Sequence, residues 1–354
     1  MPFAETREKL SRTARSGAVI QNFNSEVAAM MRFKSLSIAG AAIALGVVLV
    51  AVAATAAPAP TASIPYLSLS APQQILDVPQ RWEGDQQPHT LSVVELNRDG
   101  YQYWAWYGLN QGRGMGLARS NDLVHWTKYS DNPIWLNARW PSVLKVRDSF
   151  GHTVLYFAIT RDYDMPSSHI VLAKSTDGIH LKEVGVLVKT VTGQRNQNPN
   201  LFHDPRSGKF FLTFYRGNDH DDFSLVSKSA STIQGLASAP EKLLMHTSTT
   251  VAAPTLLYVP NGGAEDHGVY YLATEIYPGR YSKEGSGWQV KVFYADRPDG
   301  QFRPVADNPV QSGDRACMFQ FIFDGKFYGY QSHLNPKTDR WEMEVVTAVL
   351  HRKR

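Results

Sequence analysis

Carboxylate side chains occur in this sequence at places where strands are predicted to begin or end. Asp85, Asp162 and Glu275 are the three candidates for chemistry. Side chains of this type transfer protons or attack electrophilic carbon, and hydrolysis of a glycosidic bond uses two of them. Their separation decides the stereochemistry, because about 5–5.5 Å between the carboxyl groups favours retention and roughly 6.5–9.5 Å favours inversion.

A second set of residues would hold a ligand rather than react with it. Its members carry amide, guanidinium, imidazole, carboxylate or indole groups: Gln87, Trp140, Arg161, Asn198, Arg216, Asp219, Arg280 and His333. Guanidinium and amide groups form directed hydrogen bonds with hydroxyls, and an indole ring stacks against the apolar face of a sugar. The set therefore indicates a polyhydroxylated ligand. The alternative is that loops are polar in most proteins, so that each residue is only solvated.

Metal ions and cofactors receive little support from the sequence. The chain has one cysteine, Cys317, so no internal disulfide can form, and we predict that this residue is small and buried in a strand. Cys and His do not cluster at the spacing of a zinc site. The acidic stretch 219–222 offers the oxygen ligands that calcium prefers. We expect no cofactor and no metal, with Ca²⁺ at residues 219–222 as the alternative.

Four segments of the chain open with a proline and continue as an apolar strand. The prolines are Pro88, Pro141, Pro199 and Pro254, which are 53, 58 and 55 residues apart, and residues 315–319 form a fifth, degenerate copy. Each copy is followed by a turn rich in Gly and Asp and then by an aromatic strand, such as YQYWAWYG or KFFLTFYR. β-Branched and aromatic residues bounded by such turns predict hairpins.

Third and fourth strands follow the hairpins, and no long amphipathic helix is predicted between residues 65 and 354. Four antiparallel strands repeated five times predict an all-β five-bladed propeller over residues 65–354. The last copy lacks a fourth strand, and residues 67–78 are predicted to supply it and so to close the ring. The alternative, a β-sandwich, gives no reason for proline, turn and aromatic strand to recur in one order.

The propeller geometry predicts where the polar side chains meet. The first strand of a blade is innermost and begins at one face, and the second strand returns to that face. The starts of the first strands and the loops after the second strands therefore surround one funnel. Besides the candidates above, further residues are placed there: Trp82, Glu83, His89, Asn196, Asp314 and Arg315.

Parts of the sequence resemble the five-bladed furanosidase superfamily, which includes family 43 arabinanases and xylosidases, invertases, levansucrases and mannoside phosphorylases. Residues 118–126, ARSNDLVHW, followed by DNPI at 131–134, are similar to a phrase that closes a blade in that superfamily. Residues 198–204, NPNLFHD, and 173–178, AKSTDG, are similar too. The resemblance covers roughly residues 65–350, and it implies the propeller fold and chemistry on sugars.

The same resemblance implies that the usual catalytic acids are replaced. Family 43 enzymes carry an Asp base before the first-blade proline, a pKa-tuning Asp before the third, and a Glu acid two residues before the fourth. The corresponding positions here are Gln87, Asn198 and Ala252. Amides and an alanine cannot take up or release a proton near neutral pH, so the inverting pair of that family is absent in this register.

Three interpretations of the altered funnel remain open. Other carboxylates can do the work, and we predict Asp85 and Glu275 for this role, with Asp162 and Asp219 in reserve. The alternative for Glu275 is a simple ion pair with Arg280. In the second interpretation the protein binds glycans without cleaving them, with Trp140, Asn198, Arg216 and His333 as the recognition surface. The third interpretation is a lyase or a phosphorylase-like enzyme, which would need the arginines for phosphate, and a protein-binding scaffold is a further class.

The first 57 residues differ from the rest of the chain. Residues 36–54 are apolar and uncharged and follow Arg32 and Lys34, which predicts a secretory signal over residues 31–57. The apolar core of about 19 residues is also long enough to span a bilayer, so a membrane anchor is the alternative. Residues 1–30 are then either a segment upstream of the true start or a cytoplasmic tail, and residues 58–64 are a linker. We expect a secreted or membrane-tethered protein.

The charge of the chain argues against nucleic acid as a partner. Six of the 36 Lys and Arg residues and three of the 32 Asp and Glu residues lie within residues 1–57, which leaves 30 basic and 29 acidic residues in the remainder. A nearly neutral domain has no field that would attract a polyanion. We therefore expect a monomer that acts on a polysaccharide or oligosaccharide containing furanose or pentose units, either as a glycoside hydrolase or as a glycan-binding protein.

Overall fold

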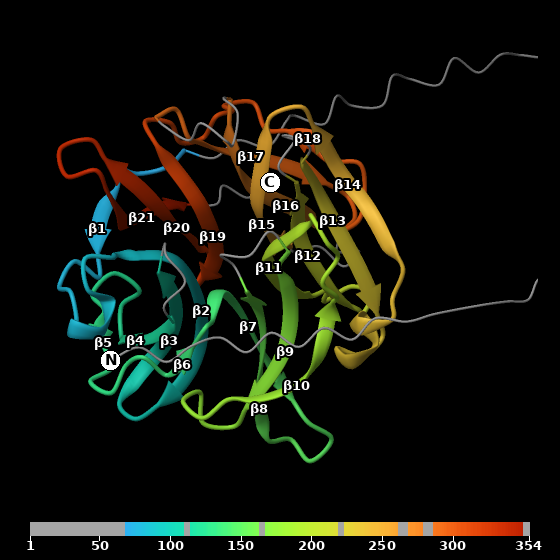
Figure 1. The fold of residues 1–354 in the computed structure, drawn as a ribbon, viewed down its shortest axis with the longest axis horizontal. Helices are drawn as coiled ribbons and strands as arrows, with labels where there is room; N and C mark the ends of the chain where they lie inside the picture. Colours follow the sequence, from blue (N-terminus) through green and yellow to red (C-terminus); the bar gives the residue numbers. More distant parts are fainter. Residues whose placement is uncertain are drawn as a thin grey trace, which may run out of the picture. The chain divides into compact units, whose positions relative to one another are not determined.

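The computed structural model describes residues 68–109, 114–162, 167–218, 223–260, 268–278 and 286–349. They form five antiparallel sheets arranged around an axis, four of them with four strands and the first with one extra short strand (Figure 1). The predicted upstream segment, signal and linker, residues 1–64, lie outside the described residues. Among the residues described, no helix is long and apolar enough to cross a membrane.

The first three blades follow each other along the chain. Blade one contains β2 (Pro88–Arg98), β3 (Tyr101–Leu109), β4 (Gly114–Ser120) and β5 (Thr127–Lys128), with β6 (Trp135–Leu136) also paired to β4. Blade two contains β7 (Arg139–Arg147), β8 (Thr153–Arg161), β9 (His169–Ser175) and β10 (Lys182–Val188). Blade three contains β11 (Arg195–His203), β12 (Phe210–Gly217), β13 (Phe223–Ala230) and β14 (Glu241–Thr247).

The last two blades complete the ring. Blade four contains β15 (Thr250–Val259), β16 (Val269–Tyr277), β17 (Gln289–Ala295) and β18 (Arg303–Pro304). Blade five contains β19 (Arg315–Phe323), β20 (Lys326–Asn335), β21 (Arg340–Val349) and β1 (Gln73–Ile75). Two short 3₁₀ helices, η1 (Arg81–Glu83) and η2 (Gln234–Ala237), lie in the connections. The predicted five-bladed all-β propeller is confirmed.

The predicted closure of the ring is also confirmed. Strand β1 pairs antiparallel with β21, with Gln73 opposite Val345 and Ile75 opposite Met343. An N-terminal strand therefore completes the sheet that contains the C-terminal strand, which covers an edge that would otherwise offer unpaired backbone groups. Ile75 is buried in the cluster between blades one and five, so this short strand is held by packing as well as by hydrogen bonds.

The proline-led strands are innermost, as predicted. Strands β2, β7, β11, β15 and β19 contact one another in this order around the ring. Polar side chains join them: the N–H groups of Val143, Leu201 and Leu256 donate to Ser92 Oγ, Ser142 Oγ and Asn200 Oδ1, at 3.0, 2.8 and 3.0 Å. Blades one, two and three therefore each satisfy a backbone donor of the next blade at the same level.

Alternating side chains of the second strands fill the spaces between the sheets. Along β3, Trp104 and Trp106 pack toward blade two, whereas Tyr103, Ala105 and Tyr107 pack toward blade five. This alternation is the period of two that a strand imposes on its side chains. Both faces of β3 are buried in this way, because a propeller blade is covered on each side by a neighbour.

Candidate functional site

A ring of residues with unusual backbone conformation surrounds the axis. Trp140, Asn198, Ala253 and Cys317 have φ values of 49°, 49°, 48° and 52°, in the left-handed region that side chains other than glycine rarely adopt. Each lies where the register between the first and second strand of its blade shifts. A bulge of this kind turns the chain and aims a side chain or an N–H group away from the sheet.

The corresponding position in blade one is Thr90, which corrects the sequence-based register. The hydrogen bonds between blades align Ser92 with Ser142 and Asn200, so the residue that aligns with Trp140 and Asn198 is two positions before Ser92. Gln87 lies three residues further toward the N-terminus and does not occupy this position. The sequence-based alignment relied on Pro88. This proline begins β2 and does not follow the position that aligns with the bulges of the other blades.

The axis beneath this ring is narrow. A cavity of about 30 Å³ is lined by Thr90, Trp140, Asn198, Ala253, Cys317 and the residues that follow them. That volume is about the share of one water molecule in the liquid. This space is small beside a sugar, so we expect a ligand of that size at the mouth where the inner strands begin.

Glu275 is a buried carboxylate beside this ring. It lies on β16 directly opposite Ala252 on β15, and it is only 7% exposed. Its Oε2 accepts hydrogen bonds from the backbone N–H of Cys317 at 3.0 Å and from the Cys317 thiol at 2.9 Å. The side chain predicted as catalytic is thus held at the centre, and by a residue of the neighbouring blade.

His89 and Arg139 lie near Cys317, from blades one and two. The Nε2 atom of His89 is 3.4 Å from Cys317 Sγ, and the Arg139 guanidinium lies over the Trp140 ring at 3.9 Å. Burial, and secondarily the charge of Arg139, lowers the pKa of His89 from 6.5 to about 3. His89 is therefore neutral at physiological pH, and it can donate from one ring nitrogen and accept at the other.

Aromatic rings of blades four and five pack beside Cys317. Tyr277 and Trp288 are stacked at 4.9 Å, Trp288 meets Trp341 edge to face at 6.2 Å, and Trp341 meets His89 at 4.8 Å. Cys317 packs in the same cluster. The centre thus combines one carboxylate, a thiol, a neutral imidazole, a guanidinium and an aromatic wall.

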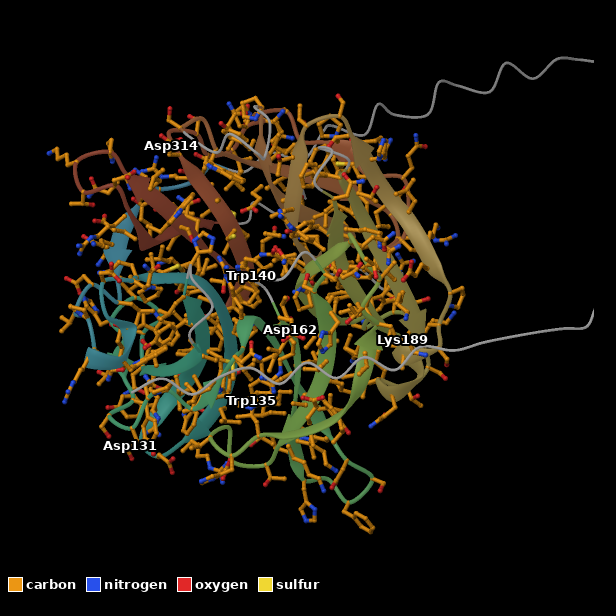
Figure 2. The ribbon with its side chains drawn as sticks, in the orientation of Figure 1. Asp131, Trp135, Trp140, Asp162, Lys189 and Asp314 are labelled. Carbon is orange, nitrogen blue, oxygen red and sulfur yellow. The ribbon has the colours of Figure 1, made fainter. Side chains whose placement is uncertain are left out.

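The predicted binding residue Arg161 and the predicted catalytic residue Asp162, both of blade two, form other contacts. Arg161 donates to the carbonyls of Leu136 and Asn137 at 2.9 and 2.6 Å, and it lies over the Trp135 ring at 4.3 Å. These bonds brace the loop before β7. The Asp162 carboxylate is 3.3 Å from His169 Nδ1 and is exposed. Figure 2 shows Trp140 and Asp162 toward the middle of the ring in this view.

Arg216 and His333 lie in ion pairs within their own blades. Arg216 forms a two-point contact with Glu241 at 2.7 and 3.0 Å and donates to Asn196 Oδ1 at 2.9 Å. His333 Nδ1 is 3.0 Å from the Glu344 carboxylate, which also pairs with Arg315. Asp314 accepts hydrogen bonds from the backbone N–H groups of residues 287 and 288. Ion pairs and hydrogen bonds to neighbouring residues therefore hold these side chains of the wider funnel wall in place.

Asp85 and Gln87 lie in the segment between η1 and β2. Asp85 is exposed, and it accepts a 3.4 Å hydrogen bond from Gln86, while Gln87 is half-buried. Asp219, Arg280 and the acidic stretch 219–222 lie outside the described residues.

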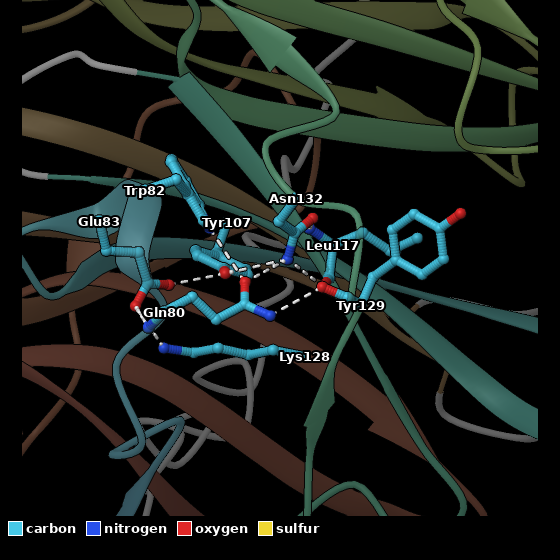
Figure 3. A network of polar contacts seen from close by, with 8 residues as sticks. All are labelled: Gln80, Trp82, Glu83, Tyr107, Leu117, Lys128, Tyr129 and Asn132. Carbon is cyan, nitrogen blue, oxygen red and sulfur yellow. Dashed lines mark hydrogen bonds and ion pairs between the residues drawn. The ribbon is translucent and has the colours of Figure 1, made fainter.

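Two other residues expected at the funnel, Trp82 and Glu83, do not lie there. Figure 3 shows Glu83 inside blade one, where it binds Tyr107, Lys128 and the backbone of residue 80. Glu83 is fully buried and Trp82 donates to the Gln80 side chain, so neither group faces a ligand. Their proximity to Asp85 in sequence suggested the funnel, but the tight turn at Gly84, with φ of 64°, separates the two environments.

Arg139 and Cys317 lie at this centre but were not among the predicted site residues. Arg139 lies two residues before Pro141 in blade two, just as Ala252 lies two residues before Pro254 in blade four. Comparing equivalent positions in all repeats would have identified it. Within the described part of the chain, no group of three His, Cys, Asp or Glu side chains is arranged to hold a metal ion.

Solved structures share this architecture. A thermostable family-43 glycoside hydrolase aligns with 74% of this chain and 89% of its own, at 16% identity and a TM-score of 0.55. An endo-arabinase from Bacteroides thetaiotaomicron VPI-5482 aligns over 75% and 95%, at 13% identity and a TM-score of 0.55. An endo-1,4-beta-xylanase from the same organism aligns over 74% and 91%, at 18% identity and a TM-score of 0.51.

These matches define the class of fold. The chain has the five-bladed β-propeller found in family 43 glycoside hydrolases, at low sequence identity. No protein-family model matches the sequence, and no curated protein matches it either.

Proposed function

We propose that this protein is an extracytoplasmic glycoside hydrolase-like propeller that acts on a polysaccharide containing furanose or pentose units. The observation that carries the proposal is the position of Glu275. It is a buried carboxylate at the inner end of a second strand, held beside His89 and Cys317 at the mouth of a narrow axis. The fold, which family 43 hydrolases share, supports the same reading.

Glu275 can take the place of the acid that Ala252 lacks. The two residues face each other across β15 and β16, and directly opposed side chains in an antiparallel pair start about 4.5–5.5 Å apart. A glutamate side chain is long enough to bring its carboxyl group to the space above its neighbour. We therefore assign to Glu275 the role of proton donor to the leaving oxygen.

Asp85 is the proposed partner of Glu275. It lies in the exposed segment that leads into the innermost strand of blade one, across the ring from blade four. In an inverting reaction the second carboxylate activates a water on the opposite face of the sugar. Asp162, which is exposed on blade two, is the alternative base.

The sugar would be held by groups at the ends of the inner strands. Asn198 and Trp140 lie at the left-handed bulges, and the aromatic rings of Trp288 and Trp341 pack beside Cys317. Amide groups bond hydroxyls, and indole rings stack against the apolar face of a pyranose or furanose. The half-buried Gln87 would contact a ligand further out.

A second candidate function is glycan binding without cleavage. It is favoured by the identity of three residues at the inner ends of the strands: Thr90, Asn198 and Ala252 are not acids. In this case Glu275 would accept hydrogen bonds from hydroxyl groups and the aromatic wall would supply most of the affinity. We place it second because the fold is one that family 43 glycoside hydrolases share.

Hydrolysis can be tested with a panel of arabinan, galactan, xylan and fructan, with detection of new reducing ends. We expect product with at least one substrate, and we expect Glu275→Gln and Asp85→Asn each to slow its release at least about a hundredfold. Glu95→Gln is the matched control, because this carboxylate lies near the far end of β2. Unchanged turnover in both funnel variants would reject the assignment. A shift in melting temperature without product would favour the second function.

Export and quaternary state are part of the proposal. The predicted signal over residues 31–57 would deliver the propeller across the membrane, either released or tethered through residues 36–54. We propose that the exported domain is a monomer. N-terminal sequencing and cell fractionation test export, and light scattering tests the quaternary state. A propeller found only in the cytoplasm would contradict export, and an oligomer in solution would contradict the monomer.

A further inference from the structure

Cys317 touches both other titratable groups at the ring centre. Its Sγ atom is 2.9 Å from Glu275 Oε2 and 3.4 Å from His89 Nε2. Its backbone N–H also donates to Glu275 Oε2, at 3.0 Å. One residue of blade five therefore supplies two donors to a single carboxylate oxygen of blade four.

We propose that Cys317 is a positioning residue that fixes the Glu275 carboxylate through its thiol and its N–H group, with His89 orienting the thiol. Its effect on catalysis rests on the function proposed above, whereas the hydrogen bonds themselves can be tested without that function. Neither the spacing of the sequence nor the family resemblance pointed to this residue.

The left-handed backbone conformation of Cys317 lets its N–H group donate to Glu275. In the pairing of β19 with β20, Ala316 faces Ser332 and the next pair is Phe319 with Tyr330, so the register skips Cys317. Its N–H group therefore does not join the ladder between these strands and needs another acceptor. With φ at 52°, the N–H points to the neighbouring blade, where Oε2 of Glu275 accepts it.

The proton of the thiol stays on sulfur. Burial, and secondarily the charge of Glu275, raises the pKa of Cys317 well above its usual value. A neutral thiol next to a carboxylate donates its single proton to that carboxylate. The sulfur then accepts from His89 Nε2, so the chain of bonds runs from the imidazole through the thiol to Oε2.

The same observations argue against Cys317 as a nucleophile. A separation of 3.4 Å between a thiol and an imidazole resembles the dyad of cysteine hydrolases. In such a dyad the thiolate and the imidazolium stabilise each other. Here the thiolate would lie beside the Glu275 carboxylate, and the imidazolium would lie near the Arg139 guanidinium. Both charged forms are disfavoured, and the hydrogen-bonding role remains.

The presence of one cysteine in the whole chain permits a direct test. The S–H stretching band in a Raman spectrum then comes from Cys317 alone, and donation to a carboxylate shifts it to lower wavenumber. We expect Glu275→Ala to move the band to higher wavenumber, and Glu275→Gln to move it part of the way, since an amide oxygen accepts less strongly. Glu95→Gln should leave it in place. An unmoved band in both Glu275 variants would overturn the proposal.

Variants of Cys317 test the consequence for the reaction. If the wild type hydrolyses a glycan, Cys317→Ala should lower kcat about tenfold with little change in KM, because one hydrogen bond to a charged group is lost. Cys317→Ser, which keeps a donor, should recover most of the rate. Equal rates for Ala and wild type would overturn the positioning role. If the wild type neither cleaves nor binds a glycan, the proposed function fails, while the Raman shift still decides the hydrogen bond.

Discussion

The Nζ atom of Lys128 lies 2.8 Å from Oε2 of Glu83, and the two side chains are only 7% and 0% exposed. Glu83 also accepts from the Tyr107 hydroxyl at 2.7 Å and from the backbone N–H of Gln80 at 2.7 Å. The segment between the closing strand β1 and the innermost strand β2 is thereby tied to strands β3 and β5. This buried ion pair holds the N-terminal junction of the ring in place.

Removal of one partner of this pair should destabilise the propeller strongly. Lys128→Met leaves the Glu83 carboxylate buried without its cation, which costs about 3–5 kcal/mol in comparable cases. Urea unfolding measures the loss, and Lys182→Met, at an exposed lysine of β10, is the matched control. The double variant Glu83→Gln/Lys128→Met should lose less than the sum of the two single changes, because the pair is coupled. Additive losses would contradict the coupling.

His89 should contribute to the acid sensitivity of the fold. Its pKa is 6.5 in the unfolded chain and about 3 in the folded protein, so the unfolded state binds a proton that the folded state excludes. The stability that neutral His89 provides is therefore complete above pH 6.5 and is lost as the pH falls toward 3. Between these limits the free energy of unfolding should fall by up to about 1.4 kcal/mol per pH unit from this group.

The measurement for His89 is a comparison with His89→Gln across that pH range. Subtracting the two curves removes the titration of the other groups. The difference should shrink steadily as the pH is lowered from 6.5, and it should level off near pH 3. A difference that does not depend on pH would show that His89 titrates in the same way in both states.

Gly178 tests the packing between blades one and two. Its φ is 82°, and a Cβ atom added there would lie 3.0 Å from Cζ2 of Trp106. Gly151 has nearly the same φ, 83°, with no atom within 4 Å of an added Cβ. Both Gly→Ala changes cost about 1–2 kcal/mol for the left-handed backbone. Gly178→Ala should lower the free energy of unfolding by more than Gly151→Ala does, because the added Cβ atom is strained against Trp106. Equal losses of stability in thermal unfolding would refute the contact.

The closing strand should protect the protein from self-association. Ile75 of β1 is buried between blades one and five, whereas Gln74 is exposed. Ile75→Asp should weaken the pairing of β1 with β21, uncover the edge of blade five and promote aggregation. Light scattering during mild heating measures this, with Gln74→Asp as the control. A variant that stays monomeric and as stable as the control would show that the closure is dispensable.

Repetition made the architecture predictable. The order of proline, turn and aromatic strand recurs because each blade buries the same kind of inner strand, and that order predicted five blades and the N-terminal closing strand. The level of each bulge was not predictable in the same way. Pro88 begins β2, but the hydrogen bonds from neighbouring blades place Thr90, and not Gln87, in line with Trp140. A proline restricts one φ angle, whereas alignment around the axis depends on contacts with the next blade.

The amino-acid sequence alone determined which strands form and which side chains end near one face, because both follow from local patterns of polarity and turns. Only the tertiary structure decided which of those side chains meet. His89 and Cys317 are separated by 228 residues, and they lie 3.4 Å apart only because the first and last blades are neighbours in a closed ring. Glu83 and Asp85 are two residues apart, yet one is buried within a blade and the other is exposed. Local periodicity carries no information about which blades become neighbours, and for that reason the centre could be described only after the ring was closed.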